Sequence, residues 1–271
     1  CRFEESLPLE TLFGYRYGAF VLEVLPEVEE GTILGCVTDD GAFSRGAESV
    51  ACGELFTLYE KRLESVYPTQ TPAEKIPMET FSAPETERRA PAVKTACPRV
   101  LIPVFPGTNC EYDSARAMTD AGAEAQIIVL NNRTADGIAR SVESFAQALR
   151  DAQMVFIPGG FSGGDEPDGS AKFIASFFRS PAVTEAVRDL LQHRDGLMLG
   201  ICNGFQALIK LGLVPYGDIV DATPDAPTLT FNTIGRHQSR LVRTRISSNL
   251  SPWLSQCSLD DPYTVAISHG E

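Results

Sequence analysis

Hydrophobic and polar residues follow a regular alternation in the second part of the chain. Residues 98–271 carry apolar runs of strand length, and between these runs apolar residues recur three and four positions apart. The first pattern is typical of strands buried on both faces, and the second is typical of amphipathic helices. The series therefore predicts an α/β domain built on a doubly wound, mainly parallel sheet.

The expected elements follow the chain in a strict order. Strands are expected at 98–105, 125–131, 154–160 and 196–202, and helices at 111–121, 138–150, once or twice within 169–193, and from 202 to 211. Ligands bind beyond the carboxyl ends of the strands in such sheets, so residues just after each strand are the candidates for chemistry. Shorter strands at 228–232, 237–246 and 263–269 predict an extension that returns to the sheet.

The first part of the chain has a different character. Apolar runs at 18–26 and 31–37 predict a short antiparallel pair, and a helix is expected from Gly53 to Val66. Residues 1–67 form an α+β segment that is short and buries only a small core. We expect it to be the tail of a larger domain. Residues 68–97 are rich in proline and charge, which predicts a linker, or else a long loop laid over both neighbours.

The charge excludes several classes of partner. The chain has 271 residues, 43% of them hydrophobic and 22% charged, with a formal net charge of −13. Binding to nucleic acid or to an anionic membrane surface needs clustered Lys and Arg, which this chain lacks. Its apolar runs fall short of the roughly 20 residues that cross a bilayer. We expect a small-molecule or protein partner.

The cysteines indicate a reducing compartment. There are seven, an odd number spread thinly along the chain, and none forms a CxxC pair. We therefore expect a cytoplasmic protein without a disulfide framework or a zinc site. The chain starts without Met and stops just after an expected strand, so we interpret it as a fragment whose last domain is truncated at its C-terminus.

Cys202 lies in the sequence Gly-Ile-Cys-Asn-Gly, where an expected strand runs straight into an expected helix. Small flanking residues suit a tight, strained turn, and the start of a helix favours a thiolate through its dipole. A single cysteine is more often a buried structural residue. Its place at a strand end, between two glycines, favours a nucleophile elbow that carries a thiol in place of a serine.

A thiolate nucleophile needs a base, and the chain has three histidines. His193 lies at an expected helix end, where a capping role is common, and His237 lies on an expected solvated face. His269 follows an apolar strand and precedes Glu271 by two residues, which puts both side chains on one side of an extended chain. The spacing favours Cys202, His269 and Glu271 as nucleophile, base and orienting acid, although a His-x-Glu pair is also common by chance.

Acyl transfer also needs backbone donors for the developing oxyanion. The Asn203 amide follows the nucleophile directly, and the glycine-rich loop after the third strand offers Gly159, Gly160 and Phe161. A phosphate cradle is the rival interpretation of this loop. It lacks the Lys and Ser/Thr of a P-loop, and its acidic residues would repel phosphate. Those acidic residues are Asp165, Glu166 and Asp168.

Four motifs together resemble the glutaminase domain of phosphoribosylformylglycinamidine synthases, in their large single-chain form. They are VFPGTNC (104–110), PGGFSGGDE (158–166), GICNGFQ (200–206) and SHGE (268–271). The resemblance covers residues 98–271. It implies a class I glutamine amidotransferase domain with a flavodoxin-like sheet, and residues 1–67 look like the end of the synthetase half.

The resemblance also implies a reaction. Cys202 would attack the side-chain amide of glutamine, His269 would shuttle protons, and Glu271 would orient His269. Ammonia would leave, and a glutamyl thioester would be hydrolysed. The ammonia would serve the conversion of formylglycinamide ribonucleotide in purine biosynthesis, in a synthetase part of the same parent chain that uses ATP and Mg²⁺. No cofactor is expected in this chain itself, which has no complete ATP site.

The resemblance implies further contacts to the substrate. Gln206, four residues after the nucleophile, and Asn232 would hold L-glutamine, while Gly160, Phe161 and Asn203 would supply the oxyanion donors. An alternative from another class is a noncatalytic or redox-sensing flavodoxin-like module with an exposed elbow cysteine. That module would need neither Gln206 nor the pairing of a histidine with a carboxylate.

Overall fold

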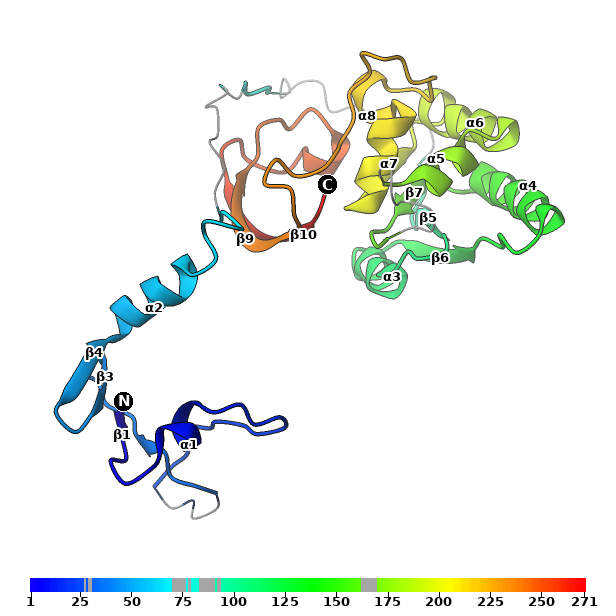
Figure 1. Ribbon diagram of the computed structural model, residues 1–271. Helices are drawn as coiled ribbons and strands as arrows, with labels where there is room; N and C mark the ends of the chain where they lie inside the picture. The colour runs from blue at the N-terminus through cyan, green and yellow to red at the C-terminus, as the bar shows by residue number, and fades with distance from the viewer. Residues whose placement is uncertain are drawn as a thin grey trace. The chain divides into compact units, whose positions relative to one another are not determined.

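The chain forms two compact units, Cys1–Glu74 and Lys75–Glu271 (Figure 1). The computed structural model describes residues 1–26, 28, 31–69, 77, 79–82, 91, 94–161 and 170–271. The division falls inside the expected 68–97 linker, most of which lies outside the described residues. One described piece of that linker runs beside the C-terminal extension, where Phe81 forms an isolated parallel bridge with Ser248.

The first unit is a small sheet with two helices. Its strands are β1 (Arg2–Phe3), β2 (Gly35–Cys36), β3 (Ala42–Arg45) and β4 (Glu48–Ala51), in the order β2-β1-β3-β4, with helices α1 (Leu9–Phe13) and α2 (Cys52–Lys61). The rings of Phe13 and Phe43 pack on Phe3 with centroids 5.7 and 5.8 Å away. None of the described residues of this unit is fully buried, as expected for so short a segment.

The antiparallel pair expected at 18–26 and 31–37 is wrong. Residues 18–26 form no strand, and β2 pairs instead with β1. The run 20–25 is apolar at nearly every position, so it lacks the alternation that assigns one face to a core, and Phe20 is 84% exposed. The expected helix is present as α2, but it ends at Lys61 and not near Val66.

The second unit is built on a four-stranded parallel sheet, which confirms the predicted fold class. Its strands are β5 (Arg99–Val104), β6 (Glu124–Val129), β7 (Met154–Ile157) and β8 (Leu197–Gly200), in the order β6-β5-β7-β8. The first two strands in sequence are exchanged in space, which is the doubly wound, flavodoxin-like order. Every carboxyl end therefore opens on the same edge of the sheet.

Helices follow the strands as the periodicity predicts. They are α3 (Glu111–Asp120), α4 (Ala135–Asp151), α5 (Lys172–Phe178), α6 (Pro181–Arg188), a π-helical turn (Asp189–His193), α7 (Asn203–Leu211) and α8 (Leu213–Tyr216). Among the described residues, no helix is both long enough and apolar enough to cross a bilayer.

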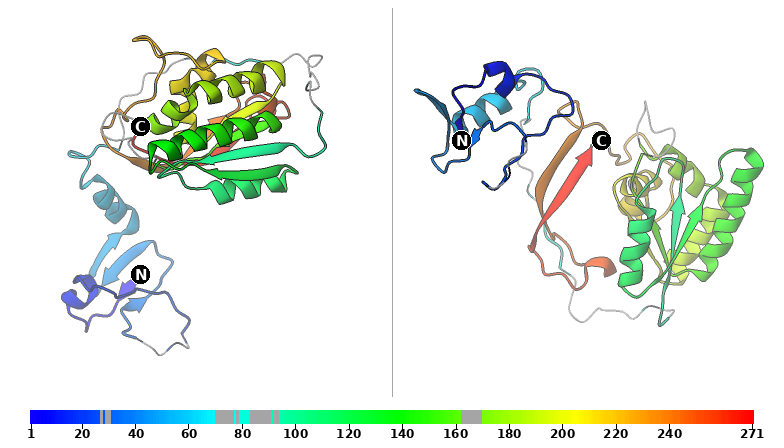
Figure 2. Two further views of the ribbon diagram at one scale, coloured as in Figure 1. Left: turned by 90° about the vertical axis from the view of Figure 1, so that its right-hand side faces the viewer. Right: turned by 90° about the horizontal axis from the view of Figure 1, so that it is seen from below.

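Alternate residues of the strands face two separate cores. Leu101 and Val155 pack with buried side chains of α4, α5, α6 and α7, whereas Val100 and Phe156 pack with the face of α3. This division follows from the period of two along a strand. It places α3 on one face of the sheet and the other helices on the opposite face (Figure 2).

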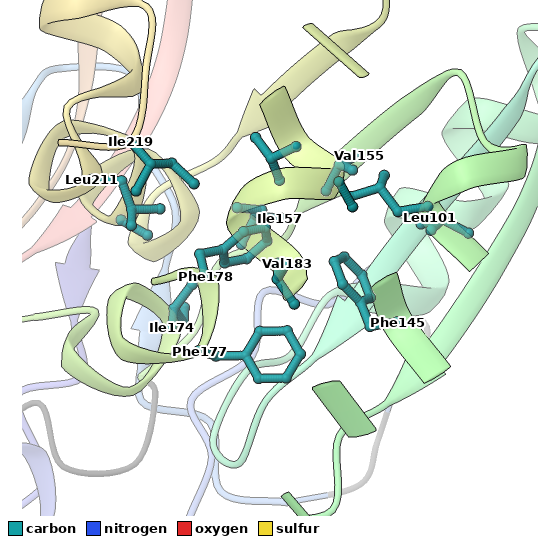
Figure 3. Close-up of a cluster of buried hydrophobic side chains, with 14 of the residues drawn as sticks. Leu101, Phe145, Val155, Ile157, Ile174, Phe177, Phe178, Val183, Leu211 and Ile219 are labelled. Atoms are coloured by element: carbon teal, nitrogen blue, oxygen red, sulfur yellow. The ribbon is translucent and has the colours of Figure 1, made fainter. Parts of the chain in front are cut away.

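Phenylalanine rings dominate the larger core (Figure 3). The Phe178 side chain is fully buried, and its ring lies 5.7 Å from Phe145, 5.9 Å from Phe177 and 6.3 Å from Phe105. The first two pairs are edge-to-face, the arrangement favoured by the ring quadrupoles. This cluster joins α4 and α5 to the sheet and holds the helical layer in place.

The C-terminal extension is a hairpin of its own. Strands β9 (Gln238–Arg245) and β10 (Pro262–His269) pair antiparallel along their full lengths and form a separate two-stranded sheet. The expected return to the parallel sheet is therefore wrong, because in the described part of the chain β9 and β10 form a ladder with each other and with no strand of that sheet. Residues 228–232, expected as a strand, are irregular.

A side chain, and not a strand ladder, connects the extension to the sheet. Trp253, in the 3₁₀ turn Pro252–Leu254 between β9 and β10, donates its indole N–H to the Met198 carbonyl at 3.1 Å. Met198 lies in β8, the edge strand, where carbonyl groups are available to a donor from outside the sheet.

Truncation of Phe178 tests the aromatic cluster. Phe178→Ala leaves a cavity among three rings and should lower the free energy of unfolding by about 3–5 kcal/mol. Urea denaturation followed by circular dichroism measures the change. Tyr112→Ala, at a ring that is 77% exposed on α3, is the control and should change stability by less than about 0.5 kcal/mol. Equal losses in the two variants would contradict the assigned core.

Candidate functional site

Cys202 lies in a strained turn between β8 and α7. Its backbone has φ 52° and ψ −111°, and the helix begins at the next residue, Asn203. A non-glycine residue with positive φ is uncommon and is held only where the surrounding structure imposes it. The thiol side chain is exposed. The strand, turn and helix expected around this cysteine are therefore present.

Close packing explains the two flanking glycines. A Cβ on Gly204 would lie 2.1 Å from the Ile157 carbonyl oxygen, and one on Gly200 would lie 2.4 Å from the Gly204 carbonyl oxygen. Any side chain at either position would push α7 away from β7 and β8. The missing Cβ atoms let the helix start directly over the strand ends and present Cys202 at their edge.

The loop after β7 runs beside the cysteine. A Cβ on Gly159 would lie 3.1 Å from the Cys202 Cβ, and the neighbouring Gly160 has φ 119°. Two hydrogen bonds join this loop to the loop after β5: the Asn109 amide donates to Gly159 O, and the Phe161 amide donates to Gly107 O, both at 3.1 Å. The loop is thereby fixed against its neighbour.

These bonds change one expected role. The Phe161 amide, expected among the oxyanion donors, is engaged with Gly107. Within the described ranges no acceptor is assigned to the Gly160 amide, so Gly160 is the better donor from this loop. Asn203 is 1% exposed at the first position of α7, with its amide next to the nucleophile. The acidic residues expected to repel phosphate, 165, 166 and 168, lie outside the described residues.

The C-terminal segment reaches α7 one turn beyond Cys202 (Figure 1). The Gln206 side chain donates from Nε2 to the Glu271 carbonyl oxygen at 3.4 Å, and the Ser170 amide donates to Glu271 Oε2 at 2.9 Å. Ser170 has no signal in the sequence, because it acts through its backbone. The contacts bring the expected triad acid to the helix that begins at the expected nucleophile.

The expected triad is not closed by hydrogen bonds. His269 ends β10 with a half-buried side chain, and no described group accepts from or donates to its buried Nδ1. Among the described residues, no hydrogen bond joins the Cys202 thiol, the His269 imidazole and the Glu271 carboxylate. Catalytic hydrogen bonds commonly shorten only when substrate is bound, so this arrangement is compatible with catalysis.

Asn232 holds the same segment from the other side. Its Nδ2 donates to His269 O at 2.8 Å and to Arg236 O at 3.0 Å, and its backbone amide donates to Gly270 O at 2.8 Å. Both side-chain N–H groups are therefore engaged with the protein. Only the Oδ1 atom of Asn232 is left to make the expected direct contact with glutamine.

The other two histidines lie where the sequence predicts them, one at a helix end and one exposed just before β9. His193 ends the π-helical turn, and His237 is exposed with Nε2 2.9 Å from Ser268 Oγ. All seven cysteines are free thiols in this structure. Cys110 is exposed just past β5, also with positive φ. In the described part of the chain, no cluster of three or more His, Cys, Asp and Glu side chains is placed to hold a metal ion.

Comparisons with known proteins find similar sequences for the second unit. The chain is 33% identical over 173 residues to phosphoribosylformylglycinamidine synthase subunit PurQ of Rubrobacter xylanophilus, covering 64% of each. It is 31% identical over 178 residues to the Campylobacter jejuni subunit of that name, covering 64% of this chain and 63% of the relative. The chain thus spans less than two thirds of the length of these curated relatives.

A solved structure, "Structure of PurLQS from Thermotoga maritima", also matches, with 24% identity, a TM-score of 0.46, and coverage of 64% of this chain and 67% of that one. Residues 97–271 match the sequence pattern of the CobB/CobQ-like glutamine amidotransferase domain. The chain therefore belongs to the CobB/CobQ-like glutamine amidotransferase domain family.

Proposed function

We propose that the chain hydrolyses L-glutamine and supplies ammonia for the synthesis of formylglycinamidine ribonucleotide. The observation that carries this proposal is the position of Cys202 in a strained elbow, with the His-Gly-Glu segment hydrogen-bonded to the same helix one turn further on. Family membership and the names of the similar PurQ subunits support it.

The chemistry follows from the residues at this edge of the sheet. The Cys202 sulfur attacks the side-chain amide carbon of glutamine, and His269 transfers the thiol proton to the leaving nitrogen, which departs as ammonia. The Gly160 and Asn203 amides stabilise the oxyanion. Water, deprotonated by His269, then cleaves the thioester and releases glutamate. Glu271 orients the imidazole throughout.

We also propose how the remaining polar side chains act. Gln206 lies one helical turn from the nucleophile and is 8% exposed. This position suits a contact with the α-amino or α-carboxylate group of the glutamine substrate. Asn232 acts mainly by holding the backbone of His269 and Gly270, because its side chain donates to the His269 carbonyl oxygen and its backbone amide donates to the Gly270 carbonyl oxygen.

The ammonia that glutamine hydrolysis releases needs an acceptor site. We propose a synthetase component as the partner, with ATP and Mg²⁺ bound there. The separate unit Cys1–Glu74 ahead of the family match supports the hypothesis that the synthetase and the glutaminase share one polypeptide. We also propose that the protein acts in the cytoplasm.

Affinity labelling tests the nucleophile. Diazo-oxo-norleucine, a reactive glutamine analogue, should alkylate Cys202 alone, and glutamine should block the reaction. Intact mass and peptide mapping measure the labelling, and glutamine hydrolysis is assayed alone and with a synthetase component and its substrates. Cys202→Ser should abolish labelling and lower hydrolysis by more than about 10³-fold.

Cys110→Ser is the matched control, since Cys110 is also an exposed thiol just past a strand with positive φ. It should leave labelling and hydrolysis unchanged. Equal labelling of all cysteines without protection by glutamine would favour the redox-sensing alternative, and a Cys110→Ser variant as inactive as Cys202→Ser would refute the assignment.

Kinetics of Asn232 variants separate its two possible roles. Asn232→Ala removes the side-chain donor to the His269 carbonyl oxygen and should lower kcat about tenfold, while KM for glutamine changes less than about twofold. Asn232→Asp keeps the shape but loses the donors, so it should behave in the same way. A large rise in KM at constant kcat would show that Asn232 binds the substrate.

A further inference from the structure

One face of α7, the helix that follows the proposed nucleophile, carries two polar side chains. Gln206 and Lys210 are four residues apart in α7, so their side chains share this face. Gln206 contacts the Glu271 carbonyl oxygen. Lys210 lies one turn further along the helix.

Lys210 connects to Glu271 through one intervening residue. Its Nζ donates to the Ser170 carbonyl oxygen at 2.6 Å, and the Ser170 amide donates to Glu271 Oε2 at 2.9 Å. Both hydrogen bonds involve a charged group and are therefore stronger than bonds between neutral partners. Among the ion pairs of the described residues, none joins Lys210 directly to Glu271, so the connection runs through the Ser170 backbone.

The Ser170 backbone needs such an anchor. Ser170 is 6% exposed and precedes Ala171, which has φ 59° and is fully buried. A left-handed alanine costs free energy and persists only where neighbouring groups fix it. The Lys210 bond fixes the carbonyl of the peptide that joins these two residues, and the Glu271 carboxylate accepts from the amide on the other side of the Ser170 Cα. The Arg179 guanidinium donates a hydrogen bond to the Lys210 carbonyl oxygen at 2.7 Å, so the C-terminal end of α7 is itself held in place.

We propose that Lys210 is a positioning residue for the glutaminase reaction. It holds Ser170 so that the Ser170 amide keeps the Glu271 carboxylate in place to orient His269. The inference rests on the proposed function, because it assigns Lys210 a role through the proposed triad acid. Lys210 does not touch the substrate, and its loss should slow the chemical step without weakening glutamine binding.

The test combines kinetics with a double-mutant cycle in the full chain. Lys210→Met should lower kcat for glutamine hydrolysis about tenfold, with KM within about twofold, and Lys210→Arg, which keeps a donor, should recover most of the loss. Lys172→Met is the matched control. Lys172 and Lys210 both line a hollow of about 700 Å³, but Lys172 is not part of the hydrogen bonds that connect Lys210 to Glu271. The control variant should leave kcat unchanged.

Coupling to Glu271 separates a positioning role from a structural one. In a Glu271→Ala background, Lys210→Met should cause no further loss of kcat, because the group it positions is gone. The same tenfold loss in that background, or an equal loss in Lys172→Met, would overturn the inference while Cys202-dependent hydrolysis still supports the proposed function. If the wild-type chain neither hydrolyses glutamine nor reacts with diazo-oxo-norleucine at Cys202, both proposals fail.

Discussion

The close approach of α7 to the ends of β7 and β8 is the constraint on which the site depends. Gly200 and Gly204 allow this approach because neither has a Cβ atom that would meet a carbonyl group. The helix therefore starts immediately after the strand, and the residue between them takes an unfavourable backbone conformation. The buried aromatic cluster behind the sheet offsets this local cost, because the helical layer cannot relax without opening the core.

Much of the parallel sheet and its helices is predictable from the sequence. Strands buried on both faces leave continuous apolar runs, and helices leave a three-to-four residue period, so both signals are local. The elbow at Cys202 is equally local, since glycines, strand end and helix start are adjacent in sequence. The Cys1–Glu74 unit is different. Its apolar run at 20–25 has the composition of a strand, but composition does not identify a pairing partner. The strand that pairs with β1 is β2, more than thirty residues further along the chain.

Contacts made by the backbone are invisible to sequence reasoning. The Ser170 amide that binds the Glu271 carboxylate would be present with almost any residue at that position. The occupied amide of Phe161 and the engaged donors of Asn232 depend on which segments meet in space. Residue type can indicate a catalytic cysteine or histidine, whereas the partners that orient them follow only from the fold.

The contact between Trp253 and β8 gives the protein an internal optical reporter. Trp253 is the single tryptophan of the chain, and its indole lies where the C-terminal hairpin joins the parallel sheet. That hairpin ends in His269, so the intrinsic emission of the protein senses the attachment of the element that carries this histidine. Separation of the hairpin from β8 exposes the indole to water and shifts its fluorescence to longer wavelength, without an added label.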